Sequence, residues 1–219
     1  MNFALRKKLL PANPWSGVEF PVRVRGLFRP HFVRWSEQRR IELHAQPHLR
    51  NIVRIITETG LRVCKELMSM TKHQLDLPNA VVWIPDSKTP NGIAEAPLTS
   101  LAIDAFRDQL SIAGDGPFLL PSDLNPTGHQ VELKTVWQKS LRRAEVPYFR
   151  IYDLRSTSAT RLSAGGVADE WVTQLLRQGN SQVFKRSSQM KLQMKGEALQ
   201  KINRQANEMR LDSGPAMVQ

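Results

Sequence analysis

The chain has one cysteine, a shortage of acidic residues and no long apolar run. Cys64 is alone among 219 residues, so no disulfide can form within the chain, which suits a reducing compartment. Its apolar, helical surroundings predict a core position. No stretch approaches the roughly 20 apolar residues that cross a bilayer, and the N-terminal apolar segment is too short for a signal peptide. We therefore expect a cytoplasmic protein without a membrane partner.

Acidic side chains are outnumbered by basic ones. Lys and Arg total 31 against 20 Asp and Glu, which gives a formal net charge of +11 and a pI of ≈ 10.3. Such a chain attracts polyanions, and nucleic acid is the first candidate. The plainer alternative is that the charge only keeps the protein soluble. Hydrophobic residues make up 41% of the chain, enough for the core of one domain of ordinary size.

The sequence divides into an arm, a body and a tail. Residues 1–34 carry four prolines and scattered basic residues, which indicates an extended arm. Residues 35–208 form the body, and residues 209–219 are expected to be a flexible tail. Ser36 is a plausible N-cap for the first helix of the body. Helical periodicity lies within residues 35–45, 48–60, 63–70, 99–114, 133–146, 152–166, 168–179 and 181–208.

One segment of the body has a different pattern. Val81–Ile84 are strand formers, Pro90–Gly92 predict a turn, and a second short strand ends at Pro97. We interpret this segment as a β-hairpin. The expected fold is therefore α+β and mainly α-helical, with one small antiparallel sheet packed on helices.

Four polar islands interrupt well-patterned segments. They hold Arg62, Lys88, Tyr152 with Arg155 three residues later, and Gln178. Two arginines and a lysine brought together would bind one phosphate group, because arginine donates bidentately and lysine adds a mobile proton donor. Held rigidly, they would stabilise a pentacoordinate phosphoryl transition state. No acidic cluster indicates a catalytic metal, and no cofactor is expected, so metal-free chemistry on a phosphodiester fits.

Each island also has an ordinary explanation. A lone arginine on a helix is usually a solvated charge, and a lysine in a hairpin usually serves solubility. Tyr152 would be a core residue with its hydroxyl paired. Only the order and spacing of the four islands together favour a common site.

Taken together, the islands resemble the catalytic domain of the tyrosine recombinases, the phage integrase family. "TGLRVCKEL" resembles the segment of the family's first arginine, here Arg62, and "IPDSKTPNGIAEAPL" resembles the hairpin of its lysine, Lys88. "YDLRSTSATRLSAGGV" resembles its His-x-x-Arg helix with Arg155. "VTQLLRQGNS" resembles the segment of a late histidine or tryptophan, here Gln178. The resemblance extends over about residues 35–208.

This resemblance implies site-specific DNA recombination or integration by phosphodiester transesterification. In that family a tyrosine hydroxyl attacks a DNA phosphodiester, forms a 3′-phosphotyrosyl link and frees a 5′-hydroxyl. The partner would be double-stranded DNA, bound mainly through phosphate contacts. The family acts in tetramers, so a homo-oligomer on DNA or an intact recombinase is the expected protein partner. A bacterial, nucleoid-associated protein of a mobile element is implied.

Ser187 occupies the nucleophile position that the resemblance implies. The family's tyrosine lies nine residues after the late histidine, and nine residues after Gln178 is Ser187. The only tyrosines of the chain, Tyr148 and Tyr152, lie elsewhere. The implied catalytic set is Arg62, Lys88, Tyr152, Arg155, Gln178 and the degenerate nucleophile position Ser187, of which Arg62, Lys88 and Arg155 would bind the DNA phosphate.

Other positions depart from the family pattern in the same direction. Tyr152 stands where a histidine or lysine is usual, and Gln178 replaces the later histidine or tryptophan. Lys65 lies three residues after the first arginine, where the family often has a glutamate. Glu66 follows one residue later, which on an α-helix turns it by about 100°. The family's N-terminal helical domain is not expected in this chain, and residues 1–34 resemble at most its trailing linker.

The sequence thus predicts a DNA-binding, tyrosine-recombinase-like domain that is cleavage-deficient. Two alternatives remain open. The chain is a non-catalytic DNA-binding regulator of an intact recombinase, or it is a decayed integrase fragment without a selected role.

Overall fold

The computed structural model describes residues 5–12, 31–85, 94–122, 124, 128–177 and 192–206. Within these residues the chain is mainly helical and carries one small sheet, which confirms the predicted fold class. The helices are α2 (Trp35–His44), α3 (Pro47–Thr59), α4 (Ser100–Ile112), α5 (Lys134–Arg143), α6 (Asp153–Ala164), α7 (Asp169–Leu175) and α8 (Leu192–Gln200), with a π-helical turn η1 (Val63–Leu67) and a 3-10 turn η2 (Lys72–Gln74).

The sheet contains the predicted hairpin and one further strand. β2 (Val81–Ile84) pairs with β3 (Ala94–Pro97) in antiparallel register, with Val82 opposite Ala96. The two-residue strand β1 (Leu75–Asp76) adds to the other edge of β2, so the strand order is β1-β2-β3. Sequence reasoning missed β1 because two residues are too few to show a strand periodicity.

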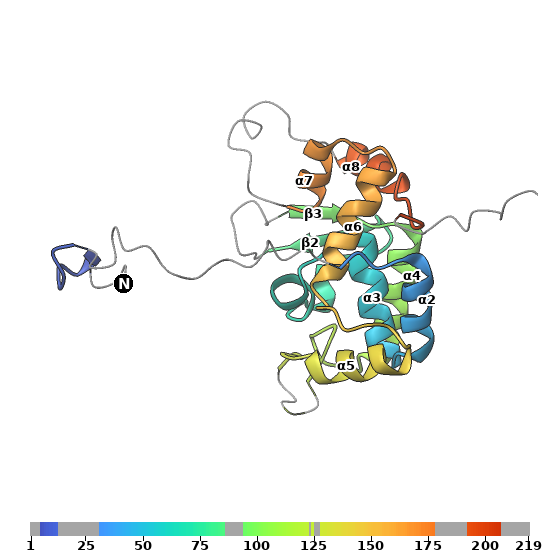
Figure 1. The fold of residues 1–219 in the computed structure, drawn as a ribbon, viewed down its shortest axis with the longest axis horizontal. Coiled ribbons are helices and arrows are strands. Elements are labelled where there is room, and N and C mark those ends of the chain that lie inside the picture. Colours follow the sequence, from blue (N-terminus) through green and yellow to red (C-terminus); the bar gives the residue numbers. More distant parts are fainter. Residues whose placement is uncertain are drawn as a thin grey trace, which may run out of the picture.

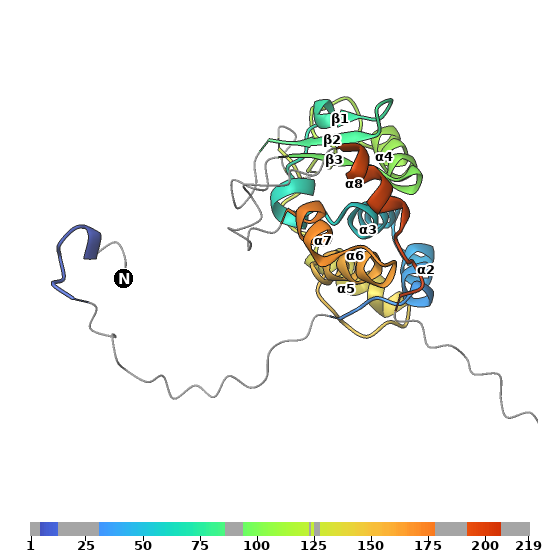
Figure 2. The ribbon, with the colours of Figure 1, turned by 90° about the horizontal axis from the view of Figure 1, so that it is seen from above.

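Helix α3 lies at the centre of the fold. Figure 2 shows it between two layers: the sheet with α4 on one side, and α6 with α5 on the other. Pro47 occupies its first turn, where a missing N–H costs nothing. Its second half is buried around nearly the whole circumference, and even Thr57, Glu58 and Thr59 are at most 6% exposed. The residues at the C-terminus of α3 therefore lie in the interior of the molecule.

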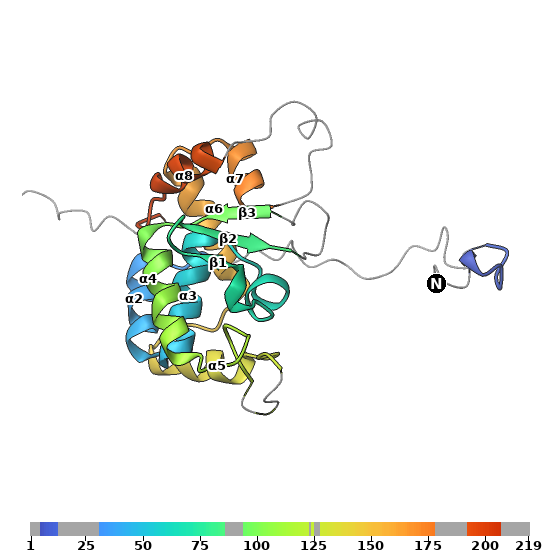
Figure 3. The ribbon, with the colours of Figure 1, turned by 180° about the vertical axis from the view of Figure 1, so that it is seen from behind.

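Two hydrophobic clusters stabilise the domain. The larger cluster joins α2 to α6 and the sheet, with Trp137 and Phe106 among its fully buried side chains. The indole Nε1–H of Trp137 donates to the carbonyl oxygen of Phe149 at 2.7 Å. The smaller cluster joins α6, α7 and α8, which lie together in Figures 1 and 3. It consists of Leu162, Val167, Val172, Leu175, Leu176, Ala198, Leu199 and Ile202.

Helix α6 carries unusually many buried polar side chains, and they anchor it. The Arg161 guanidinium donates to Gln38 Oε1 at 2.6 Å and to the carbonyl oxygen of Val33 at 3.3 Å. The backbone N–H of Val33 in turn donates to Thr157 Oγ1 at 3.0 Å. These bonds fix α6 against the segment that leads into α2, which sets the position of Arg155 in its first turn.

Several local predictions can now be compared with the structure. Helix α4 lies within the predicted helical segment 99–114, and Thr99 caps it, because its side chain accepts from the Ala102 N–H at 3.1 Å. Helix α2 begins at Trp35 rather than after Ser36, since Glu37 folds back to accept from the Arg34 N–H at 2.8 Å. Cys64 is exposed, which contradicts the predicted core position, because η1 turns it outward.

The last helix is shorter than predicted. α8 ends at Gln200, and the following residues form turns, with the Asn203 N–H donating to the carbonyl oxygen of Arg161 at 3.0 Å. Gly165 permits this packing, because a Cβ there would lie 1.6 Å from the carbonyl oxygen of Lys201. The predicted arm is described at residues 5–12 and 31–34, and the predicted tail lies outside the described residues. Among the described residues no helix is long and apolar enough to cross a membrane.

Candidate phosphate-binding site

The site begins where α3 ends. Gly60 follows α3 with a φ of +62°, a conformation that favours glycine. A Cβ at this position would also lie 2.2 Å from Leu176 Cδ2, so a side chain could not fit without moving Leu176. Gly60 therefore allows the C-terminal ends of α3 and α7 to meet. Both ends present carbonyl groups that their helices leave without partners.

Arg155 binds both of these helix ends. It lies in the first turn of α6, is 2% exposed, and donates from Nη1 to the carbonyl oxygen of Gly60 and from Nη2 to that of Leu176. The fork of one guanidinium thus joins two segments that are more than 100 residues apart in sequence. The structure places this predicted site residue at the centre of a buried cluster.

Arg62, two residues after Gly60, also contacts the C-terminal end of α7. Its Nη2 donates to the carbonyl oxygen of Arg177 at 2.7 Å, and its Nη1 pairs with Glu66 Oε1. The backbone N–H of Arg62 also donates to Glu66 Oε2 at 2.8 Å. Arg62 and Arg155, predicted to act together, are therefore both bound to the main chain at the end of α7.

The π-helical turn η1 corrects one sequence prediction. Glu66 was expected to lie about 100° around the helix from the position of the family's glutamate, which Lys65 occupies. In η1 the N–H groups of Leu67 and Met68 donate to carbonyl groups five residues earlier, at 3.0 and 2.8 Å. The wider turn absorbs the additional residue and places Glu66 against Arg62. Lys65, at the position expected for the glutamate, is exposed.

Arg177 is a site residue that sequence reasoning missed. It is 4% exposed and has a φ of +54°, a backbone conformation that non-glycine residues seldom adopt. Its Nη2 donates to Glu66 Oε2 at 2.9 Å, and its Nη1 donates to the carbonyl oxygen of Leu175 at 2.8 Å. The only signal in the sequence was a cation directly after the apolar pair Leu175–Leu176.

The four charged groups perturb one another. Burial, together with the positive charges of Arg177 and Arg62, lowers the pKa of Arg155 to about 10. Burial likewise lowers the pKa of Arg177, although Glu66 opposes the shift. Burial by itself would raise the pKa of Glu66, but the charge of Arg177 and the hydrogen bonds from Arg62 and Arg177 keep it below its ordinary value. The cluster therefore has more positive charge than its single carboxylate balances.

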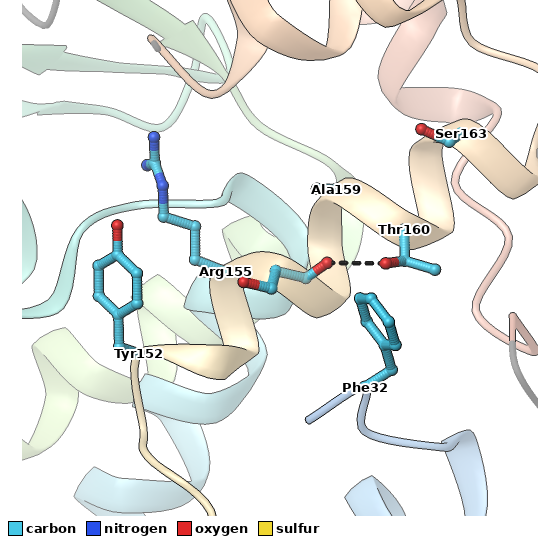
Figure 4. A pocket seen from close by; sticks show the side chains of 7 residues that line it. Phe32, Tyr152, Arg155, Ala159, Thr160 and Ser163 are labelled. Atoms are coloured by element: carbon cyan, nitrogen blue, oxygen red, sulfur yellow. Dashed lines mark hydrogen bonds between the residues drawn. The ribbon is translucent and has the colours of Figure 1, made fainter. Parts of the chain in front are cut away.

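Tyr152 lies beside this cluster at the entrance to a pocket. It precedes α6, is 50% exposed, and lines a pocket of ≈ 410 Å³ together with Arg155. Figure 4 shows the Tyr152 hydroxyl and the Arg155 guanidinium pointing in the same direction from the start of α6. The remaining lining residues are Phe32, Ser156, Ala159, Thr160 and Ser163. Arg155 is thus accessible from this side although nearly all of its surface is buried.

Three predicted site residues lie outside the described residues. Lys88 belongs to the segment between β2 and β3, and Gln178 and Ser187 belong to the segment between α7 and α8. Their roles stay predictions. Arg62, Tyr152 and Arg155 are the predicted site residues that the structure brings together.

Comparison with solved structures identifies the class of fold. The integrase from mycobacterium phage Brujita superposes with a TM-score of 0.65 and 19% identity, covering 95% of this chain and 69% of that one. The lambda integrase tetramer bound to a Holliday junction gives a TM-score of 0.58 and 18% identity, covering 95% of this chain and 57% of that one. The fold is that of tyrosine-recombinase catalytic domains.

Sequence comparison then identifies the family. The model of the phage integrase family matches residues 36–205, so the chain belongs to the phage integrase family. The integrase of Salmonella phage P22 is 27% identical over 148 residues, which make up 62% of this chain and 38% of that protein. The chain therefore spans well under half the length of this relative.

Proposed function

We propose that this chain is a DNA-binding domain of the integrase type, whose reaction class is site-specific recombination or integration of double-stranded DNA. In this proposal Arg62 and Arg155 bind the non-bridging oxygens of one DNA phosphate, and Lys88 assists them. Ser187 in the nucleophile position makes the domain cleavage-deficient. The proposal is supported by family membership and by solved relatives that include a lambda integrase tetramer on a Holliday junction.

One observation carries the binding half of the proposal. Arg62 and Arg155 are 93 positions apart in sequence, yet both donate to consecutive main-chain carbonyl groups, those of Arg177 and Leu176. Side chains that merely solubilise a surface would not be buried and fixed in this way, because burying a guanidinium costs free energy unless a partner offsets it. A phosphate oxyanion is the ligand that paired guanidiniums suit best.

The cleavage half of the proposal rests on the chemistry of Ser187. A phenol has a pKa of about 10, whereas an aliphatic hydroxyl is a much weaker acid and a poorer leaving group. A serine oxygen is also several ångströms closer to its own backbone, and reaction requires atoms about 3–3.5 Å apart. A reactive serine would need a nearby base, and the chain has no histidine after His129.

The binding half is tested with Arg62→Ala/Arg155→Ala on duplex DNA. We expect affinity to fall by at least about tenfold and the salt dependence to lose about one counterion, because both guanidiniums contact the same phosphate. The matched control is Arg39→Ala/Arg107→Ala, which removes the same charge from exposed positions. Equal losses in the two double variants would contradict the proposal. Thermal unfolding identifies variants that fail to fold, and the milder Arg62→Lys/Arg155→Lys then replaces the alanine pair.

The cleavage half is tested by comparing the unaltered protein with Ser187→Tyr. Supercoiled plasmid and nicked duplex are the substrates, and relaxation and SDS-resistant protein–DNA adducts are scored. We expect adducts only from the tyrosine variant, because only a phenol has the required acidity and reach. Robust adducts from the unaltered protein would refute cleavage deficiency. The regulator alternative would gain if DNA binding is site-specific and neither protein forms adducts.

A further inference from the structure

Among the described residues the charges of the buried cluster do not balance. Three guanidiniums, those of Arg62, Arg155 and Arg177, lie together with one carboxylate, that of Glu66, which pairs with Arg62 and Arg177. Counting three positive charges and one negative charge gives a formal charge of +2. Uncompensated charge inside a protein is costly, so a cluster of this kind favours the ligand whose charge completes it.

We propose that Arg177 makes this site a receptor for a phosphate carrying two negative charges, such as the terminal phosphate at a DNA break, in preference to an internal phosphodiester. The inference rests on the proposed function, because it assumes that Arg62 and Arg155 bind DNA phosphate. An internal phosphodiester carries one negative charge and leaves the cluster at +1. A terminal phosphate carries close to two above its second pKa of about 6, and the charges then balance.

Arg177 supplies the surplus positive charge of the cluster, and its role is not only to form an ion pair that neutralises Glu66. Glu66 is already bound by Arg62 through both its guanidinium and its backbone N–H. A second guanidinium on the same carboxylate is not needed to satisfy Glu66, and it requires a non-glycine residue at a φ of +54°. Such a backbone conformation is strained for a residue with a side chain and persists where the surroundings hold it. Four partners hold Arg177 here, counting Arg62 as donor to its carbonyl group.

A ligand would reach the cluster through Arg62 and Arg155. The side chain of Arg62 is 14% exposed, and Arg155 lines the ≈ 410 Å³ pocket next to the Tyr152 hydroxyl. Arg177 lies behind them and would act through its charge, as a positioning residue that does not touch the ligand. The Nε atom of Arg155 is buried and has no hydrogen-bond partner among the described residues, so its N–H is an unsatisfied donor inside the cluster.

The test measures the binding of three otherwise identical duplexes by fluorescence anisotropy. The first duplex is intact, and the second has a nick with hydroxyl groups on both sides. The third has a nick with one terminal phosphate, which is placed on the 3′ side of the nick in one sample and on the 5′ side in another. We expect the unaltered protein to prefer the terminal phosphate by about fivefold, because one further charge interacts at short range. The preference should shrink between about pH 7.5 and about pH 5, as the phosphate gains a proton.

Arg177→Gly should abolish the preference, so that its affinities for the nicked duplexes with and without the terminal phosphate become equal. Glycine adopts the backbone conformation without strain and removes the side chain with its positive charge. Glu145→Gly is the matched control, because Glu145 has the same φ of +54° at an exposed position outside the site. Arg107→Ala controls for the loss of one exposed positive charge. Both controls should keep the preference of the unaltered protein.

The outcomes separate this inference from the function on which it rests. If the unaltered protein binds all three duplexes equally at both pH values, while Arg62→Ala/Arg155→Ala weakens binding to each, the inference fails and the proposed function stands. If that double variant weakens binding to none of them, the proposed function fails as well. A preference that survives in folded Arg177→Gly also overturns the role of Arg177. The pH dependence of the unaltered protein tests the dianion preference even if Arg177→Gly does not fold.

Discussion

Two buried carboxylates eight residues apart differ in the balance of charge around them. Glu58, near the end of α3, accepts from a single guanidinium, that of Arg204, at 2.9 and 2.6 Å, and from the Thr99 hydroxyl at 2.7 Å. Glu66, just beyond α3, contacts two guanidiniums, those of Arg62 and Arg177. The first cluster is balanced in charge, and the second, which Arg155 also joins, has positive charge in excess.

Under the proposed function, this difference separates a structural cluster from a binding site. The Glu58 cluster joins α3, the start of α4 and the turns after α8, and its charges satisfy one another. It therefore does not favour an anion. The Glu66 cluster joins η1, α6 and the end of α7, and its excess of guanidiniums supports the proposal that it binds an anionic ligand. Burial alone would not separate the two, because both carboxylates are 2% exposed.

The largest expected effect comes from breaking the balanced cluster. Arg204→Ala should lower the free energy of unfolding by about 3 kcal/mol, because it leaves the Glu58 carboxylate buried without its charge partner. Urea unfolding at neutral pH measures this change. Binding of DNA per folded molecule should remain close to that of the unaltered protein, since Arg204 lies outside the Glu66 cluster.

Arg54→Ala is the matched control for Arg204→Ala. Arg54 also pairs with a carboxylate, Glu42, at 2.9 Å, but its side chain is 38% exposed. Its loss should cost less than about 1 kcal/mol, as is usual for a solvated pair. Equal costs for the two variants would show that the Glu58 cluster does not fasten the turns after α8.

A smaller effect, dependent on pH, is expected from Glu66→Gln. At neutral pH the variant should be less stable by about 2 kcal/mol, because an amide cannot accept from both guanidiniums as a carboxylate does. The pKa of Glu66 is held below its ordinary value of 4.5 in the folded protein. Its stabilising contribution is thus fully present above that value and is lost as the pH falls through the folded pKa.

The measurement for Glu66→Gln is the difference in unfolding free energy between the two proteins across this pH range. The difference should be constant near neutral pH and narrow progressively below about pH 4.5. Glu170→Gln, at an exposed position in the first turn of α7, should give a difference near zero throughout. A constant difference for Glu66→Gln down to acid pH would mean that the Glu66 charge contributes nothing to folding.

Sequence periodicity predicted most of the fold for identifiable reasons. The hairpin followed from the strand formers Val81–Ile84 and the Pro-Asn-Gly turn after them, and α4 followed from the helical periodicity of residues 99–114. Arg62 and Arg155 were found because each sits in a motif with an adjacent helix boundary. Such features are local, and local patterns survive when the rest of the structure is unknown.

Features that depend on contacts between distant segments were not predictable. Arg177 looked like any surface arginine, because only the packing of Gly60 against Leu176 buries it. The exposure of Cys64 and the contact of Glu66 with Arg62 both depend on η1, and periodicity analysis assumes an α-helical turn. α8 ends early because the Lys201 backbone packs against Gly165, which no local signal indicates.

The smallest expected effect comes from deleting Lys65, which would sharpen the account of η1. The deletion removes an exposed residue and converts hydrogen bonds that span five residues into the four-residue spacing of an α-helix. Glu66 would then follow Arg62 by three positions and still face it, so stability should change by less than about 1 kcal/mol. DNA binding should persist.

Deleting Arg107 from the middle of α4 is the control, since every later residue of that helix then turns by about 100° and the core is disrupted. If the Lys65 deletion unfolds the protein as readily as the Arg107 deletion, the additional residue is not simply absorbed by the wider turn but is required for the Arg62–Glu66 contact.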